Sequence, residues 1–377
     1  MVISELKLKN IFIPETFLLL FIYSGEFKGL FSSSILANNG FLVITLFLCL
    51  FSCLFYIKKI VFTKGLFFSF LSFCLLLLTI YFNYNFFSYG IKSSEKFTET
   101  ITILPAIALV GITLNNSKES YKRLLNSILL VSGVLCLIFL TNYASNSFTG
   151  GALTKSYQRT GILSALGFVA SWIRIENNNR DFYKYIGLFL CSFFFISLLL
   201  SSHRAGIFCL LFSVLYLLGS RIKTYFKTKS IAIIGGITFL IYLFLVRFFD
   251  EIALVRRMVF AYYNFEEYIR ILMLKRSFEE AANNIFFGGG FGMFEQLTGI
   301  SGYRHPHNFF AEILLELGLI GLILYLITYF GWVIQKGAKA PKRALIAIFI
   351  CCITYACFSG DISEHRLLLF TAFLLRK

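Results

Sequence analysis

Two histidines and an arginine precede a strongly apolar segment near the C-terminal end of the chain. Residues 304–308 read Arg-His-Pro-His-Asn, and residues 309–321 that follow are apolar apart from Glu312 and Glu316. A charged side chain at membrane depth costs about 3 kcal/mol even on lenient insertion scales. We therefore interpret this run, and His307 in particular, as part of a functional site.

Asn308 and Glu316 have expected roles around His307. Asn is a favoured N-cap residue, so Asn308 can satisfy the first N–H groups of the helix, and a histidine is not needed for capping. A carboxylate within a span should be paired or protonated. We expect Glu316 to orient His307 or an arginine, and we count His305, Asn308 and Glu316 among the substrate-binding residues.

Arginines from separate parts of the chain complete the candidate site. A guanidinium group binds phosphate in bidentate fashion and keeps its proton, so several of them at a membrane interface suit the diphosphate of a lipid carrier. A second interpretation is open for Arg204, as a snorkelling charge in a hairpin, and for Arg270 and Arg276, as solvated salt bridges. The set comprises Arg159, Arg204, Arg270, Arg276 and Arg304.

The elements that must position these residues are membrane-spanning helices. The 377 residues are 58% hydrophobic and 18% aromatic, and apolar runs recur at the spacing of about 20 residues that a bilayer requires. We expect an all-α polytopic protein of about 12 helices that forms a single domain, 1–377. The expected spans are 11–27, 36–57, 66–88, 98–114, 124–142, 159–173, 185–201, 205–220, 230–249, 308–334, 344–358 and 364–375.

The formal charge of +16 predicts membrane topology instead of a nucleic-acid partner, because the basic residues alternate with the spans. By the positive-inside rule, the loops rich in Lys and Arg and both termini are cytoplasmic. The opposite side then receives segments 28–35, 89–97, 143–158, 202–204, 250–307 and 359–363. All the candidate site residues lie at that side, which argues against a transporter with charges accessible from both faces.

Segment 250–307, which we call the lid loop, is long and nearly balanced in charge, as lids and binding loops often are. Residues 262–287 have helical spacing, and the glycine run 288–292 should end that helix. This run is expected to be a turn, with a phosphate-contacting backbone as the alternative. The cysteines lack metal-type spacing and no hydrolase or metal motif occurs, so we expect no metal, disulfide or cofactor.

These segments resemble the O-antigen polymerase and ligase superfamily of polytopic membrane proteins. The resemblance covers residues 159–334 and is carried by the motifs at 159–161, 202–205, 270–292 and 307–321, the last being the most specific. It implies a C-type glycosyltransferase-like membrane fold and metal-independent transfer of an undecaprenyl-diphosphate-linked glycan at the periplasmic face. By the same resemblance, Arg204 and Arg270 hold the diphosphate, Arg159 assists, and His307 is the catalytic base or orients one.

The expected function is that of an O-antigen polymerase of the bacterial inner membrane, which works in the lipid bilayer together with a chain-length regulator protein. Its substrate is an undecaprenyl-diphosphate-linked oligosaccharide that is transferred to another lipid-linked repeat unit. The alternatives are an O-antigen ligase that transfers the finished chain to the lipid A core, and a transporter of anionic lipid-linked substrates. The spacing of arginine and glycine reported for some polymerases is not cleanly present after Arg159 or Arg204.

We predict that Arg204→Ala and Arg270→Ala each abolish chain extension, because each removes a cation that neutralises the departing diphosphate. Extension is read from the polymer ladder of lipopolysaccharide on a gel, and the abundance of each variant in the membrane is measured in parallel. Normal ladders from both variants would refute the assignment.

Overall fold

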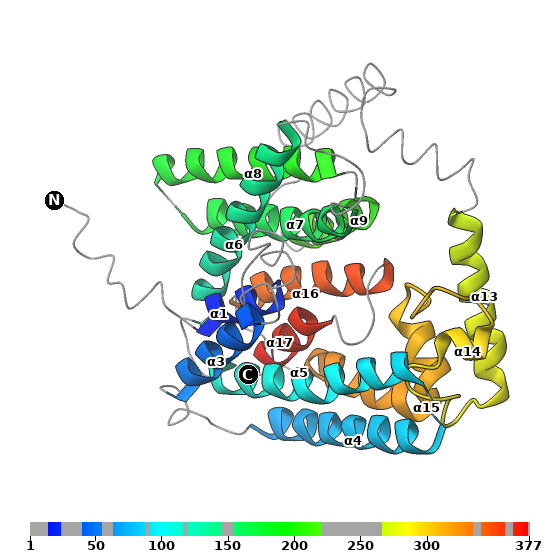
Figure 1. Ribbon diagram of the computed structural model, residues 1–377. Helices are drawn as coiled ribbons and strands as arrows, with labels where there is room; N and C mark the ends of the chain where they lie inside the picture. Colours follow the sequence, from blue (N-terminus) through cyan, green and yellow to red (C-terminus); the bar gives the residue numbers. More distant parts are fainter. Residues whose placement is uncertain are drawn as a thin grey trace. The chain divides into compact units, whose positions relative to one another are not determined.

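The computed structural model of the protein describes residues 14–23, 40–54, 63–87, 90–115, 120–144, 154–178, 180–201, 203–219, 266–334, 341–358 and 365–375. These residues are helical or lie in turns, and no strand occurs among them. The helices are α1 (Pro14–Ile22), α3 (Gly40–Leu54), α4 (Lys64–Phe87), α5 (Ile91–Asn115), α6 (Ser120–Ala144), α7 (Thr154–Asn177), α8 (Asp181–Ser201), α9 (Arg204–Gly219), α13 (Glu266–Asn283), α14 (Phe294–Thr298), α15 (Phe309–Phe330), the 3-10 helix η5 (Gly331–Ile334), α16 (Pro341–Phe358) and α17 (Arg366–Leu374) (Figure 1).

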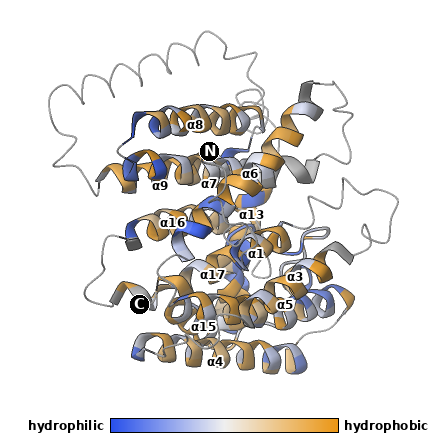
Figure 2. Cartoon of the chain, turned by 90° about the vertical axis from the view of Figure 1, so that its left-hand side faces the viewer, coloured by the Kyte–Doolittle hydropathy of each residue, from blue (hydrophilic) through white to orange (hydrophobic). Residues whose placement is uncertain are grey.

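Five of the described helices are long and apolar enough to cross a bilayer: α4, α5, α6, α8 and α15. Shorter apolar helices are found at 42–53, 204–219 and 343–358. Figure 2 shows hydrophobic residues along most of α4 and α8, and many of their large apolar side chains are exposed, as a lipid-facing surface requires. The chain is therefore a polytopic helical membrane protein. The expected total of 12 spans stays a prediction, and the expected span 230–249 lies outside the described residues.

The described residues group into two compact units. One unit contains residues 1–127 and 268–377, in which α15 packs against α4 and α17 packs against α5. The other contains residues 128–267, in which α7 packs against both α8 and α9. The expected single domain 1–377 with the lid loop as an insertion stays a prediction.

Helix α15 is interrupted at Gly318, whose φ of 65° and ψ of −165° are not helical. The span expected at 308–334 is found as α15, with an interruption that the sequence did not indicate. The interruption frees backbone groups on both sides of Gly318, and buried backbone groups in a membrane protein must find partners. They find them in the lid loop, since Leu319 N–H donates to Ile285 O at 2.8 Å and Gly289 N–H donates to Leu315 O at 2.8 Å.

Two further hydrogen bonds join the backbones of the lid loop and α15. Ile320 N–H donates to Phe286 O at 3.3 Å, and Gly290 N–H donates to Glu316 O at 3.4 Å. The two backbones approach so closely that a Cβ atom on Gly288 would lie 2.3 Å from the carbonyl carbon of Glu316. A Cβ on Gly318 would lie 2.4 Å from Phe286 O. The glycine run is thus a turn, as expected, and the N–H groups of Gly289 and Gly290 are occupied by carbonyl groups of α15 instead of facing a phosphate.

Helix α5 begins at Ile91, so residues 92–97 are helical where a connecting segment 89–97 was expected. Hydropathy marks only the apolar part of a helix, and here the polar first turns continue beyond it. Ser93 of this extension lies against the lid loop, because a Cβ on Gly292 would be 2.7 Å from Ser93 Cα. The extension places the charged side chains of Lys92, Glu95 and Lys96 beside the candidate site.

We predict that Gly318→Ala lowers the free energy of unfolding by at least about 2 kcal/mol more than Gly299→Ala. Gly299 has φ of 69° and ψ of 10°, the left-handed region in which alanine costs about 1 kcal/mol. Gly318 has φ of 65° and ψ of −165°, a region that is essentially restricted to glycine, so alanine is strained more there. A Cβ on Gly299 meets nothing within 4 Å, whereas one on Gly318 overlaps the backbone of the lid loop and breaks the hydrogen bonds between that loop and α15. Thermal unfolding in detergent measures the difference, and equal losses would contradict the interpretation.

Candidate active site

The entry to α15 is organised by Asn308, as the sequence predicted. Asn308 Oδ1 accepts a hydrogen bond from Ala311 N at 3.1 Å, and Asn308 Nδ2 donates to Cys357 O of α16 at 3.4 Å. The cap therefore also attaches the start of α15 to a second helix. The additional role of Asn308 in substrate binding stays a prediction.

His307, immediately before the cap, has a left-handed backbone with φ of 57°. This conformation is uncommon for a residue with a side chain and persists only where the surroundings enforce it, often at functional sites. Its ring lies edge-on to the ring of His305, with 4.6 Å between the centroids, and 6.3 Å from the ring of Tyr303. His307 Nδ1 is buried and makes no hydrogen bond to the described residues.

Burial, together with the positive charges of His305 and Arg270, lowers the pKa of His307 to about 3. The ring is therefore neutral at about pH 6.5, where a solvent-exposed histidine titrates. The cause is desolvation, which disfavours the charged ring. The positive charge of Arg270 contributes to this lowering of the pKa and so links the arginine electrostatically to His307.

The two arginines of α13 differ in their surroundings. Arg270 is exposed and acts on His307, whereas Arg276 is exposed and lies 3.5 Å from Glu279 one turn along the helix. The two arginines are six positions apart, so they do not share a face of α13. The helix itself is attached to the site by Met273, which is buried against Phe294 and Leu315. Substrate binding by Arg276 stays a prediction.

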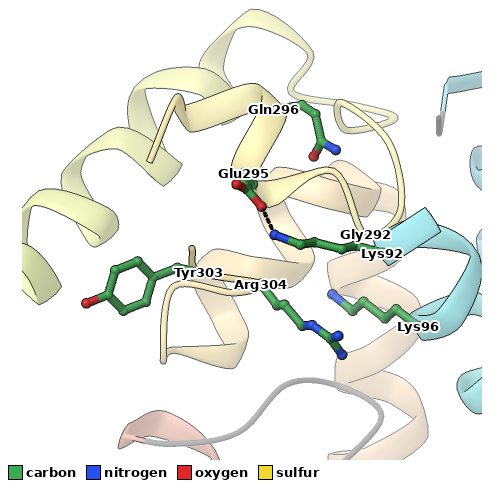
Figure 3. A pocket seen from close by; sticks show the side chains of 7 residues that line it. All are labelled: Lys92, Lys96, Gly292, Glu295, Gln296, Tyr303 and Arg304. Carbon is green, nitrogen blue, oxygen red and sulfur yellow. Dashed lines mark hydrogen bonds and ion pairs between the residues drawn. The ribbon is translucent and has the colours of Figure 1, made fainter. Parts of the chain in front are cut away.

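A small pocket lies beside the first turns of α5 (Figure 3). Lys92 pairs with Glu295 there, and Arg304 Nη2 donates to Glu95 Oε2 at 2.9 Å. Figure 3 shows the side chains of Lys96 and Arg304 pointing toward the same space. The pocket is lined by Lys92, Lys96, Gly292, Glu295, Gln296, Tyr303 and Arg304.

Glu316 pairs with Lys96 of α5, and this partner was not predicted. Lys96 Nζ donates to both carboxylate oxygens of Glu316 at 2.7 Å and also to Glu312 Oε1. All three side chains are at most 5% exposed. The expectation that a carboxylate at this depth is paired was correct, and Lys96 is a partner of Glu316. That Glu316 orients His307 or an arginine stays a prediction.

A signal for Lys96 was present in the sequence. Glu312 and Glu316 are one helical turn apart and so lie on one face, where a single cation can serve both. Segment 89–97 was assigned to the same side of the membrane as the entry to α15, and it contains Lys92 and Lys96. The lysines were overlooked because arginine was preferred for a diphosphate.

The other unit brings the remaining two motifs together. A Cβ on Gly161 of α7 would lie 2.4 Å from His203 Cβ, and a Cβ on Gly206 of α9 would lie 2.8 Å from Gly161 O. Gly206 N–H donates to His203 Nδ1 at 3.2 Å. Arg204 is the first residue of α9, and Arg159 belongs to the first turns of α7. That Arg159 and Arg204 act together with His307 stays a prediction.

Part of the chain is similar to a known protein family. Residues 189–326 match the family described as O-antigen ligase, which supports the resemblance to the O-antigen polymerase and ligase superfamily. The matched residues contain Arg204, Arg270 and His307, whereas Arg159 lies before them. No curated protein matches the chain.

We predict that the ring of His307 stays neutral between about pH 5 and 8, because its pKa of about 3 lies below this range. The unfolded ring binds a proton below about pH 6.5, so His307 contributes a loss of stability as the pH falls from there toward 3. NMR of histidine-labelled protein measures the titration, and the signal is assigned by its loss in His307→Gln. Titration with a midpoint between about 6 and 7 would contradict the burial argument.

Proposed function

From the O-antigen ligase domain at residues 189–326, we propose that this membrane protein is a glycosyltransferase that polymerises O-antigen repeat units carried on undecaprenyl diphosphate. The enzyme acts in the bacterial inner membrane with its site at the periplasmic face, and it works with a chain-length regulator. The observation that supports this most directly is the strained, largely buried His307 at the entry to α15, whose pKa is lowered by burial and by nearby positive charges, that of Arg270 among them. Both residues lie within the matched domain.

The transfer is a direct displacement at the anomeric carbon of the donor sugar. A hydroxyl oxygen of the acceptor unit forms the new bond to this carbon while the bond to the diphosphate oxygen breaks. The electron pair of the broken bond leaves with the undecaprenyl diphosphate, the hydroxyl proton passes to a base, and the configuration inverts. Arg270 and Arg204 stabilise the negative charge of the departing diphosphate, and Arg159 assists.

The neutral state of His307 suits it to accept a proton or to orient the attacking hydroxyl. A ring with a pKa of about 3 is a weak base, and general-base catalysis is strongest when the pKa is near the working pH. A bound diphosphate would bring negative charge near the ring and raise its pKa. The neutral ring thereby becomes a stronger base when the donor is bound.

An O-antigen ligase is the second candidate, and the description of the matched family favours it. In that reaction the same donor chemistry applies, while the acceptor is a hydroxyl of the lipid A core. The residues around Arg270 and His307 serve either reaction, because they act on the donor and on the attacking hydroxyl. Polymerase and ligase therefore differ in the acceptor that the protein admits.

We predict that the purified protein in detergent converts lipid-linked repeat units into a ladder of polymers. His307→Gln and Arg270→Ala should each lower the rate by about a hundredfold or more. The control Lys184→Met removes an exposed lysine paired with Asp181 and should leave the rate unchanged. Gel electrophoresis and mass spectrometry of the products measure the transfer.

The other outcomes separate the alternatives. Transfer that occurs only after lipid A core is added indicates a ligase, and binding without any new glycosidic bond contradicts both enzymes and favours a transporter. In cells, deletion of the gene gives the same distinction. Core that carries one repeat unit indicates loss of a polymerase, whereas bare core with accumulated lipid-linked polymer indicates loss of a ligase.

A further inference from the structure

Among the cations of the described residues whose ion pairs are compared by side-chain exposure, Lys96 is the most deeply buried. Its side chain is 5% exposed, and the carboxylates of Glu312 and Glu316 beside it are each 1% exposed. Burying three ionisable groups is costly, and such groups in membrane proteins are usually functional. The assigned roles of Arg270 and His307 do not use Lys96.

The contacts of Lys96 join three elements. Its ammonium group binds two successive turns of α15 through Glu312 and Glu316. The same group lies 5.0 Å from the centre of the Phe291 ring in the lid loop, a distance suited to a cation–π contact. Because Lys96 belongs to α5, these contacts set the position of α15 and of the loop relative to α5.

The position of α15 matters because His307 directly precedes its cap. Glu312 lies in the first turn of the helix, and Asn308 holds that turn through Ala311 N. His307 itself has a strained backbone, which the surrounding contacts must maintain. A displacement of the first turn would therefore move the imidazole ring away from Arg270.

We propose that Lys96 is a positioning residue for the transfer reaction, which holds the first turns of α15 so that His307 faces the reacting hydroxyl. This inference depends on the proposed glycosyltransferase function and adds to it a residue outside the matched domain. Lys96 acts through α15 and does not bind the diphosphate. The charge of its ammonium group is already shared by two carboxylates.

The test compares kcat and KM of Lys96→Met, Lys96→Arg and the exchanged pair Lys96→Glu with Glu316→Lys. Lys96→Met should lower kcat by about tenfold to a hundredfold, the range expected for a small displacement of a reacting group, with KM for the lipid-linked donor within about threefold. Lys96→Arg keeps the cation and should recover most of the rate. The exchanged pair keeps the ionic link between α5 and α15 and should recover to within about tenfold of the natural protein.

Several results would overturn the proposal. An unchanged kcat of folded Lys96→Met shows that the lysine supports stability alone, and a raised KM without recovery in the exchanged pair shows direct substrate binding. If Lys96→Met does not accumulate in the membrane, the folded exchanged pair decides, because its inactivity contradicts positioning. Lys184→Met is the matched loss of a lysine. Loss of rate in His307→Gln together with a normal Lys96→Met rejects this inference alone, whereas normal rates in both reject the proposed site.

Discussion

The requirement that buried backbone groups find hydrogen-bond partners determines how the candidate site is assembled. Gly318 interrupts α15 inside an apolar segment, where water is not available to the released N–H and C=O groups. Residues 285–290 of the lid loop supply the missing partners, and Asn83 Nδ2 of α4 donates to Phe287 O at 2.7 Å. The loop is thereby joined to α15 through main-chain hydrogen bonds and to α4 through the Asn83 side chain, and the glycines permit the close approach to α15.

Ionisable side chains surround the entry to α15, and their charges are arranged in a defined way. Lys96 is held between the carboxylates of Glu312 and Glu316, while His307 is kept neutral by burial and by the nearby positive charges. The protein therefore combines a compensated cation deep in the structure with an exposed arginine and a neutral imidazole near the surface.

Much of the fold could be predicted from hydropathy, because an apolar run of bilayer length is a strong signal. The spans expected at 66–88 and 185–201 agree closely with α4 and α8, and the capping role of Asn308 follows from its residue type. The interruption at Gly318 could not be predicted, since an isolated glycine is tolerated in a spanning helix and its partner lies about 30 residues away. The extension of α5 was missed because hydropathy does not mark polar helical turns.

The site was predicted in part, and the limits again have physical causes. The spacing of Glu312 and Glu316 indicated a buried partner, but the sequence did not identify Lys96, because pairing between distant helices depends on packing. Residue type alone also could not predict the pKa of His307, which is set by burial. The two glycine motifs at Gly161 and Gly206 proved to be neighbours, which explains why small residues are needed at both.

The ion pairs at the pocket beside α5 differ in their contact with solvent, and this difference has a consequence for the response of the protein to ionic strength. Arg304 and Glu95 are both more than half exposed, whereas Lys96 and its carboxylates are almost inaccessible. Dissolved salt screens exposed pairs over a length of about 8 Å under physiological conditions and affects enclosed pairs much less. Rising salt therefore weakens the Arg304–Glu95 ion pair first, whereas the ion pairs of Lys96 with Glu312 and Glu316 are retained.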